Sequence, residues 1–338
     1  MLNFGPGSRN EITDTGSGDN VQMPTPPVRP LIGVALGGGA ARGWAHIGII
    51  KTLHAAGFAP DIIGGTSMGA VVGGFYATHA IDTLEQFATD LNKRRMFRLM
   101  DFNFTGSGLI SGNKVGDLII ENIGEHVIED LPLKYLAVAT ELETGHEIWL
   151  AKGQLVDAMR ASYAMPGIFK PHKVHGRWLV DGALVNPVPV SLCRAQGARL
   201  VIAVNLNSDF LGRGTVVRSH DHYEPDNEDT VMEEILPDAK NSHAVNRLLR
   251  RQLVGTRNGP PGISRVMFDS YNIVQDRIAR SRLAGDPPDI TIGPRLGHIG
   301  LFDFHRAQEA IDIGVEATER MLDDISFAVK ALSTANKA

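Results

Sequence analysis

A serine held between two glycines constrains the fold of this chain more than any other feature. Ser67 stands in the pentapeptide GTSMG at residues 65–69, directly after a short apolar run. The small apolar segment that follows, residues 70–75, predicts a buried helix. A side chain at Gly65 or Gly69 would collide with neighbouring backbone in so tight a turn. The pattern is typical of a strand–turn–helix unit that presents a nucleophilic serine, and it predicts a serine hydrolase or an acyltransferase.

A second glycine-rich turn lies earlier in the chain. The apolar run at residues 31–36 predicts a buried strand, and the heptapeptide GGGAARG at residues 37–43 follows it. A glycine-rich turn between a strand and a helix directs several backbone N–H groups at one point, where an anion binds. The chain lacks the Gly-Lys-Ser/Thr of a Walker loop, and Ala40 stands where a G-x-G-x-x-G motif needs glycine. With Ser67 downstream, the turn favours an oxyanion over a phosphate.

Two charged residues accompany these turns. Arg42 has three open interpretations: it fixes the turn, it faces an acidic headgroup, or it pairs with a carboxylate at the edge of the sheet. Asp181 ends an apolar strand and precedes Gly182. Asp-Gly is a common turn pair, but a serine nucleophile also needs a base, and Asp181 is the most conspicuous acid for that role.

Histidines offer a competing arrangement. In an α/β-hydrolase the order along the chain is serine, acid, histidine, so a histidine after Asp181 would complete a triad. The candidates are His220, His222, His243, His298 and His305. None of the histidine spacings is typical of a metal site, so neither a metal nor a cofactor is expected.

Composition restricts the class of protein. The chain has 338 residues, is 43% hydrophobic and 21% charged, and carries a net charge of −5. It can therefore build a large core, and a general nucleic-acid binder is not expected. Cys193, the single cysteine, excludes internal disulfides and a Cys-based zinc site. No signal or membrane-spanning segment is evident, so we expect a cytoplasmic protein that at most contacts the inner membrane surface peripherally.

Strands alternate with helices along the chain, which predicts an α/β fold with a mainly parallel sheet. Residues 1–30 are expected to form a flexible tail, residues 31–325 the catalytic domain, and residues 326–338 a C-terminal tail. Residues 207–262 are polar and rich in charge clusters. This insertion could be a lid over the active site, a membrane-facing flap or a solvated surface excursion.

The apolar patterns also predict individual elements. Residues 83–99 are expected to form one helix, residues 173–180 one strand, and residues 304–325 one closing helix. Residues 135–140 and 146–150 predict two strands joined as a hairpin.

Three short motifs, in this order, resemble those of the patatin-like phospholipases. They are GGAARG at residues 38–43, GTSMG at residues 65–69 and DGA at residues 181–183. The chain is most similar to the bacterial branch related to neuropathy target esterase. The similarity covers residues 31–206 and 264–318, and the motifs are specific as a set.

The resemblance implies a three-layer α/β/α fold and a Ser67–Asp181 dyad without histidine. Ser67 would attack the carbonyl of an ester, and Asp181 would take its proton and later activate water. The implied oxyanion hole consists of the amides of Gly38, Gly39, Ala40 and Met68, and the supporting positions are Gly37, Arg42, Gly43, Gly65, Gly69 and Gly182. The family usually has glycine at the position of Ala40, whose amide can serve if its φ is not positive.

The implied substrate is a carboxylic ester with a fatty acyl chain, such as a phospholipid, a lysophospholipid or a neutral lipid ester, and no metal is needed. A dyad requires that partial burial raise the pKa of Asp181. Three alternatives stay open at this point. They are an acyltransferase that uses the same serine, a Ser-His-Asp esterase, and a catalytically silent lipid-binding protein.

Overall fold

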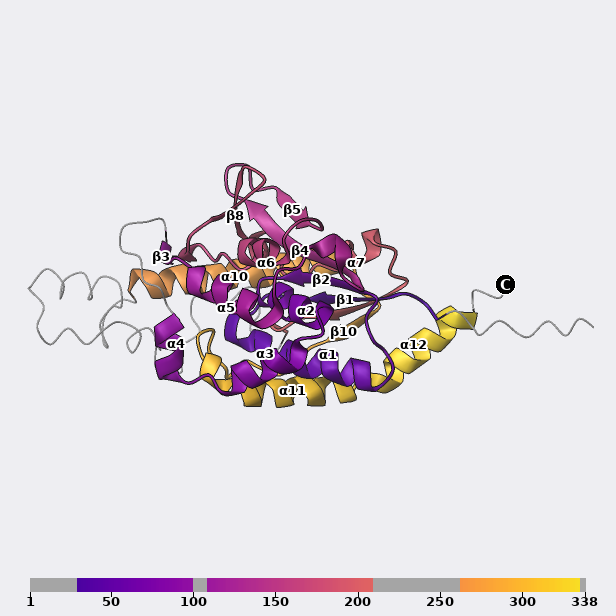
Figure 1. Cartoon of the computed structure of the whole chain (residues 1–338). Helices are drawn as coiled ribbons and strands as arrows, with labels where there is room; N and C mark the ends of the chain where they lie inside the picture. The colour runs from indigo at the N-terminus through magenta and orange to yellow at the C-terminus, as the bar shows by residue number, and fades with distance from the viewer. Residues whose placement is uncertain (1–28, 100–107, 209–261, 335–338) are drawn as a thin grey trace, which may run out of the picture.

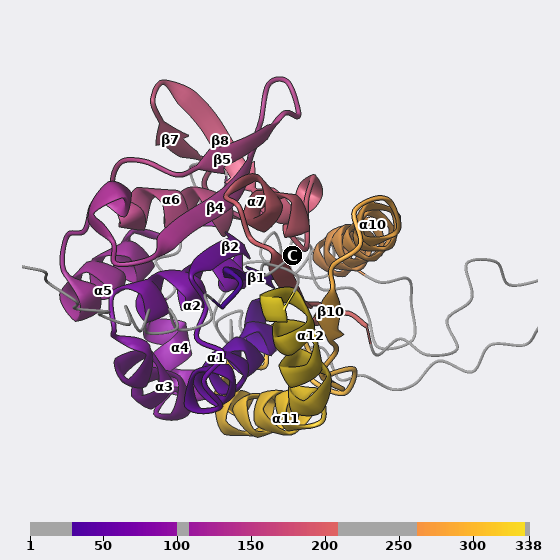
Figure 2. The same cartoon turned by 90° about the vertical axis from the view of Figure 1, so that its right-hand side faces the viewer.

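An eight-stranded sheet forms the centre of the molecule (Figure 1). The structure is a computed structural model that describes residues 29–99, 108–208 and 262–334. The expected N-terminal tail and polar insertion lie almost entirely outside the described residues. Helices cover both faces of the sheet, which confirms the predicted three-layer α/β/α fold (Figure 2).

The strands of the central sheet are β1 (Ile32–Leu36), β2 (Ile62–Thr66), β4 (Lys134–Glu141), β5 (Glu147–Leu150), β7 (His172–Val174), β8 (Arg177–Asp181), β9 (Leu200–Val204) and β10 (Ile290–Ile292). Their order is β10-β9-β1-β2-β4-β8-β7, with β5 also paired to β4. The strands from β10 to β4 in this order are parallel, whereas β5, β7 and β8 pair antiparallel. A separate pair consists of β3 (Gly108–Ile110) and β6 (Gly167–Phe169).

The α-helices are α1 (Ala45–Ala55), α2 (Met68–Ala77), α3 (Ile81–Thr89), α4 (Lys93–Leu99), α5 (Asn113–Ile123), α6 (Leu155–Ser162), α7 (Val190–Ala195), α10 (Ile263–Gly285), α11 (Ala307–Glu319) and α12 (Leu322–Thr334). Short 3₁₀ turns are η1 (Ala40–Trp44), η2 (Ile128–Asp130), η3 (Gly182–Leu184) and η4 (Phe304–Arg306). Helix α1 packs along α11 on one side of the sheet, while α7 and α10 lie on the other (Figure 2).

Side chains that alternate along the strands separate the two layers of the core. Ile32 and Leu36 of β1 belong to the large cluster that α1, α2, α6 and α11 cover. Gly33 and Ala35 face α7 and α10 instead. A Cβ on Gly33 would lie 2.7 Å from the Cβ of Cys193, so small residues on this face allow α7 to approach the sheet closely.

The segment predicted as one helix over residues 83–99 is two helices, α3 and α4. The break lies at Asn92, whose side-chain oxygen accepts a hydrogen bond from the backbone N–H of Arg95 at 2.9 Å. This is the bond of a helix N-cap, so Asn92 begins a new helix in place of continuing the old one.

The strand predicted over residues 173–180 is a hairpin of β7 and β8. His175 and Gly176 have φ values of +47° and +84°, and positive φ at both central residues is what a two-residue hairpin turn requires. The prediction was wrong because histidine is not a usual turn former, although glycine after it is.

The closing helix also differs from the prediction. Residues 304–325 contain η4, α11 and the start of α12, and α12 continues to Thr334. The expected tail over residues 326–338 is therefore helical for most of its length, because Ala328, Val329 and Leu332 pack against the core. Within the described ranges, no helix is both long enough and apolar enough to cross a membrane.

Candidate active site

Ser67 lies in a strained turn between β2 and α2. Its φ of 55° and ψ of −123° place it in a backbone region that residues other than glycine rarely adopt. Such strain costs about 1–3 kcal/mol and is common at functional sites. A Cβ on Gly65 would lie 2.5 Å from the Cα of Ala70, and one on Gly69 would lie 2.1 Å from the carbonyl oxygen of Leu36, so both positions need glycine.

Hydrogen bonds hold this turn in place. The N–H of Ser67 donates to the Ser162 hydroxyl at 2.9 Å, and Ser162 is the last residue of α6. The Ser67 carbonyl accepts from the N–H of Ala70 at 2.9 Å. The buried Tyr135 hydroxyl donates to the carbonyl of Ala70 at 2.8 Å. Sequence reasoning assigned no role to Ser162 or Tyr135, because neither has a local pattern that relates it to Ser67.

The register of the sheet brings Asp181 to Ser67. Thr66 of β2 pairs with Val138 of β4, and Asp181 of β8 pairs with the next residue, Ala139. At Val138 and Ala139, strand β5 pairs with the other edge of β4, so β2 and β8 must lie one after the other along the same edge. Strand β2 runs parallel to β4 and β8 runs antiparallel to it, so the carboxyl ends of β2 and β8 meet. The Ser67 hydroxyl donates to Oδ2 of Asp181 at 2.7 Å.

Asp181 is completely buried and hydrogen-bonded. Its Oδ1 accepts from the N–H of Ala183 at 2.9 Å, and its backbone carbonyl accepts from the Thr140 hydroxyl at 2.9 Å. Burial raises the pKa of Asp181 from 3.8 to about 6, although the hydrogen bonds from Ala183 and Ser67 and the nearby Tyr271 act to lower it. The carboxylate is thus mostly ionised at neutral pH, but it binds a proton more tightly than an ordinary aspartate does.

Gly182 follows Asp181 where no side chain fits. A Cβ there would lie 2.2 Å from the carbonyl oxygen of Val138. Gly43 is equally restricted, because a Cβ on it would lie 2.4 Å from the Cβ of Met68. The close approach at Gly43 brings the glycine turn after β1 against the start of α2.

The predicted oxyanion donors differ in whether their N–H groups already donate a hydrogen bond within the protein. The N–H of Gly38 donates to the carbonyl of Pro187 at 3.0 Å. No acceptor among the described residues takes the N–H of Gly39, Ala40 or Met68. Ala40 has a φ of +47°, in the left-handed region, so the condition that its φ not be positive is not met. The turn therefore imposes on alanine a backbone geometry that suits glycine.

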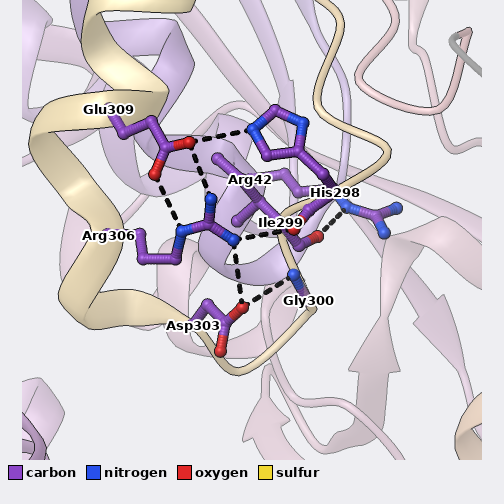
Figure 3. Close-up of polar contacts among 7 residues, drawn as sticks. All are labelled: Arg42, His298, Ile299, Gly300, Asp303, Arg306 and Glu309. Atoms are coloured by element: carbon purple, nitrogen blue, oxygen red, sulfur yellow. Dashed lines mark hydrogen bonds and ion pairs between the residues drawn. The ribbon is translucent and has the colours of Figure 1, made fainter. Parts of the chain in front are cut away.

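Arg42 fixes the glycine turn, which was the first of its three interpretations. Its guanidinium donates to the carbonyl of Ile299 at 2.7 Å and to the side chain of Asn207 at 3.2 Å, and the residue is buried. Figure 3 shows that the segment around Ile299 is itself held by Arg306, which donates to the His298 carbonyl and to Glu309. The loop before α11 therefore supports the turn.

The two described histidine candidates, His298 and His305, make no hydrogen bond to the serine. His298 contacts Glu309 at 2.9 Å and its side chain is 54% exposed (Figure 3). None of the described histidines, His305 included, hydrogen-bonds to Ser67 or Asp181. Three further candidates, His220, His222 and His243, lie outside the described residues. In the part of the chain that the structure describes, no three His, Cys, Asp or Glu side chains are placed to hold a metal ion.

His46 supports the glycine turn in a way that sequence reasoning missed. This residue of α1 is completely buried, and its Nε2 lies 2.7 Å from the carbonyl oxygen of Gly37. Burial lowers the pKa of His46 to about 4, so the ring is neutral at neutral pH and Nε2 carries the donated proton. The feature of the sequence that could have indicated this role is a histidine on the buried face of the helix that follows the turn.

An apolar cavity of about 190 Å³ opens beside Ser67. It extends between α2, α3, α4 and α5, and aromatic rings from the loop before α11 close one side. The residues that line the cavity include Met68, Val71, Phe87, Met96, Ile119 and Phe304. A chain of methylene groups attached to a carbonyl at Ser67 fits such a cavity.

Comparison with known proteins assigns the chain to a family. The family model described as patatin-like phospholipase matches residues 34–194. An uncharacterised NTE family protein of Mycobacterium tuberculosis is 33% identical over 326 residues, which cover 84% of this chain and 89% of that protein. Lysophospholipase nte1 of Neurospora crassa is 31% identical over 182 residues, which cover 52% of this chain and 12% of that protein.

A solved structure, VipD from Legionella pneumophila, aligns with a TM-score of 0.43 at 13% identity and covers 88% of this chain and 67% of that one. The match to the family model contains both glycine turns, Ser67 and Asp181. The mycobacterial NTE relative extends the similarity over most of both chains. The chain therefore belongs to the patatin-like phospholipase family and is an esterase of the NTE type.

Proposed function

We propose that the protein hydrolyses lipid carboxylic esters with a Ser67–Asp181 dyad. The observation that carries the proposal is the 2.7 Å hydrogen bond from the Ser67 hydroxyl to a completely buried carboxylate. A carboxylate is usually too weak a base for serine, but burial has raised the pKa of this one to about 6. Direct proton transfer between the two side chains needs no intervening histidine.

Acylation then uses the groups already in contact. As Ser67 Oγ attacks the ester carbonyl carbon, its proton moves to Oδ2 of Asp181. The tetrahedral intermediate collapses, the C–O bond to the alcohol breaks, and Asp181 returns the proton to the leaving oxygen. The acyl group stays on Ser67 and the carboxylate is restored.

The oxyanion of that intermediate needs donors with free N–H groups. The amides of Gly39 and Met68 meet this condition, whereas the amide of Gly38 is held by Pro187 and Ala40 has the positive φ that argues against its amide. We therefore narrow the proposed oxyanion hole to the amides of Gly39 and Met68 and assign Gly38 to the support of the turn. Met68 is the first residue of α2, so the helix dipole adds to its effect on a negative charge.

The apolar cavity defines the acyl side of the substrate. A volume of about 190 Å³ is several times the roughly 30 Å³ that one water or methylene occupies, so the cavity has room for an acyl chain of several methylenes. Each buried methylene contributes about 0.8 kcal/mol, so acyl chains of medium or greater length are favoured over acetate. Phospholipids, lysophospholipids and neutral lipid esters all supply such chains.

The proposal is tested with a panel of lipid and p-nitrophenyl esters. Ser67→Ala and Asp181→Asn are each expected to reduce kcat/KM roughly a thousandfold or more, with the fold retained by circular dichroism. Thr140→Val, which removes a hydroxyl that binds only the Asp181 backbone, is the matched control for a nearby change. Full activity in either dyad variant would contradict the mechanism, and preferential transfer to added alcohols would identify an acyltransferase.

Peripheral membrane contact is a further part of the proposal. Helix α4 has the sequence KRRMFRL, with exposed Lys93, Arg94 and Arg98 and no acidic residue, while Met96 lines the cavity. A basic helix beside an acyl-chain cavity is complementary to an anionic lipid surface. Arg94→Glu/Arg98→Glu is expected to weaken sedimentation with phosphatidylglycerol vesicles and to leave hydrolysis of a soluble ester unchanged. Equal vesicle binding by the variant would refute this contact.

A further inference from the structure

Helix α10 brings two polar side chains to the far side of the catalytic carboxylate. It packs against η3, the turn that directly follows Asp181. Tyr271 and Gln275 are four residues apart on α10, so they lie on the same face of the helix. Sequence reasoning gave neither residue a role.

The hydroxyl of Tyr271 is buried without a partner. Among the described residues, no atom accepts a hydrogen bond from this hydroxyl or donates one to it in ordinary geometry. Buried hydroxyls are nearly always satisfied, so an exception next to an active site calls for an explanation. The ring packs with Met165 and Ile168, two residues that line the acyl cavity.

The same hydroxyl is near the dyad. The pKa of Tyr271 is raised well above its ordinary value, first by burial, then by the charge of Asp181 and by hydrogen bonding to that carboxylate, whereas Gln275 acts to lower it. The hydroxyl therefore lies close to both side chains, but neither contact has the geometry of an ordinary hydrogen bond. A water beside such a hydroxyl would supply the well-directed partner that it lacks.

Gln275 lies near the nucleophile, beside Gly38. It is 5% exposed. A Cβ placed on Gly38 would lie 3.5 Å from the Cβ of Ser67 and 3.9 Å from Oε1 of Gln275. One small region beside Gly38 is therefore bordered by the nucleophile and by an amide from α10.

We propose that Tyr271 and Gln275, together with Asp181, hold the water that hydrolyses the acyl-Ser67 intermediate. The inference rests on the proposed dyad and adds a position for the second substrate. A water there would donate to the Asp181 carboxylate and to the Gln275 amide oxygen, and accept from the Tyr271 hydroxyl. Three hydrogen bonds are usual for a buried water.

The step balances within these groups. The water oxygen attacks the acyl carbonyl carbon of the ester on Ser67, and one water proton moves to Asp181. The tetrahedral intermediate then breaks its bond to Ser67 Oγ, which takes the proton back from Asp181, and the carboxylic acid leaves. Tyr271 and Gln275 exchange no proton, so they are positioning residues.

This role separates deacylation from acylation. Acylation uses the Ser67–Asp181 bond and needs no water, so Tyr271→Phe and Gln275→Met are expected to leave it nearly unchanged. Deacylation is expected to slow at least about tenfold, because the water loses a fixed partner. A merely structural role for either side chain would affect both steps, or would lower the Tm without separating them.

The test follows acyl-Ser67 directly. Full-length wild type, Tyr271→Phe and Gln275→Met are mixed with p-nitrophenyl butyrate, and intact-mass spectra measure the acylated fraction over time. A fluorophosphonate probe measures the reactivity of Ser67, which involves no water. Tyr76→Phe is the matched control, because it removes another tyrosine hydroxyl, one that contacts His54 on the surface.

The expected result is accumulation of acyl-enzyme in both α10 variants, with probe labelling within about twofold of wild type. Equal loss of labelling and turnover, or wild-type turnover without accumulation, would overturn the proposed water position. Absence of both labelling and acyl-enzyme in the wild-type protein would refute the dyad itself, and this outcome is distinct from the previous two.

Discussion

Asp181→Asn is expected to stabilise the protein while it abolishes activity. Burial raises the pKa of Asp181 from 3.8 to about 6, so the folded state binds this proton more tightly than the unfolded chain does. The ionised carboxyl therefore lowers stability above pH 6, and the cost disappears below the unfolded pKa. At about 1.4 kcal/mol per pKa unit, the cost is about 3 kcal/mol at pH 8 and about 1 kcal/mol at pH 4.5.

The measurement is urea unfolding of wild type and Asp181→Asn at several pH values. The stability of the variant relative to wild type should increase by about 2 kcal/mol between pH 4.5 and pH 8. Ser67→Ala is the matched control, because it is also inactive but keeps the carboxyl and hence the pH dependence. An equal pH dependence in wild type and Asp181→Asn would refute the assignment of a raised pKa to this residue.

Three further outcomes are expected. The pH profile of kcat/KM should rise with an apparent pKa of about 6 and then stay level. The variants His298→Ala and His305→Ala should have the same profile as wild type, and loss of activity in either variant would favour a histidine base. Ala40→Gly should raise the free energy of unfolding by about 0.5–1 kcal/mol, because glycine adopts a positive φ without strain. The control Ala158→Gly, within α6, should lower the free energy of unfolding by about 1 kcal/mol, and equal changes of both variants in urea unfolding would contradict the argument. In a series of p-nitrophenyl esters, kcat/KM should rise about fourfold per methylene until the cavity is filled, and a flat series would exclude the cavity as the acyl site.

The fold was largely predictable because its signals are local. Apolar runs followed by glycine predicted β1 and β2, and the burial of both strands agrees with strands in a parallel sheet. The errors lie where one side chain decides a boundary. Asn92 caps α4 within an otherwise helical pattern. His175 adopts a left-handed conformation that could not be predicted from its residue type.

The candidate site was predictable in its residues but not in its arrangement. Ser67 and its flanking glycines form a continuous motif, so their turn geometry followed from sequence. The partner at Asp181 depends on a register in which β2 and β8 meet on one edge of β4. No sequence pattern states that register, because it is fixed by pairing between distant strands.

The sequence by itself determined an α/β chain with a serine in a tight strand–helix turn, a glycine turn before it and an acid after it. Tertiary structure decided the rest: the burial that raises the pKa of Asp181, the positive φ of Ala40, and the approach of Tyr271 on α10. The physical reason is that motifs specify local backbone geometry, whereas the dielectric environment and the neighbours of a side chain arise only when separate segments pack together.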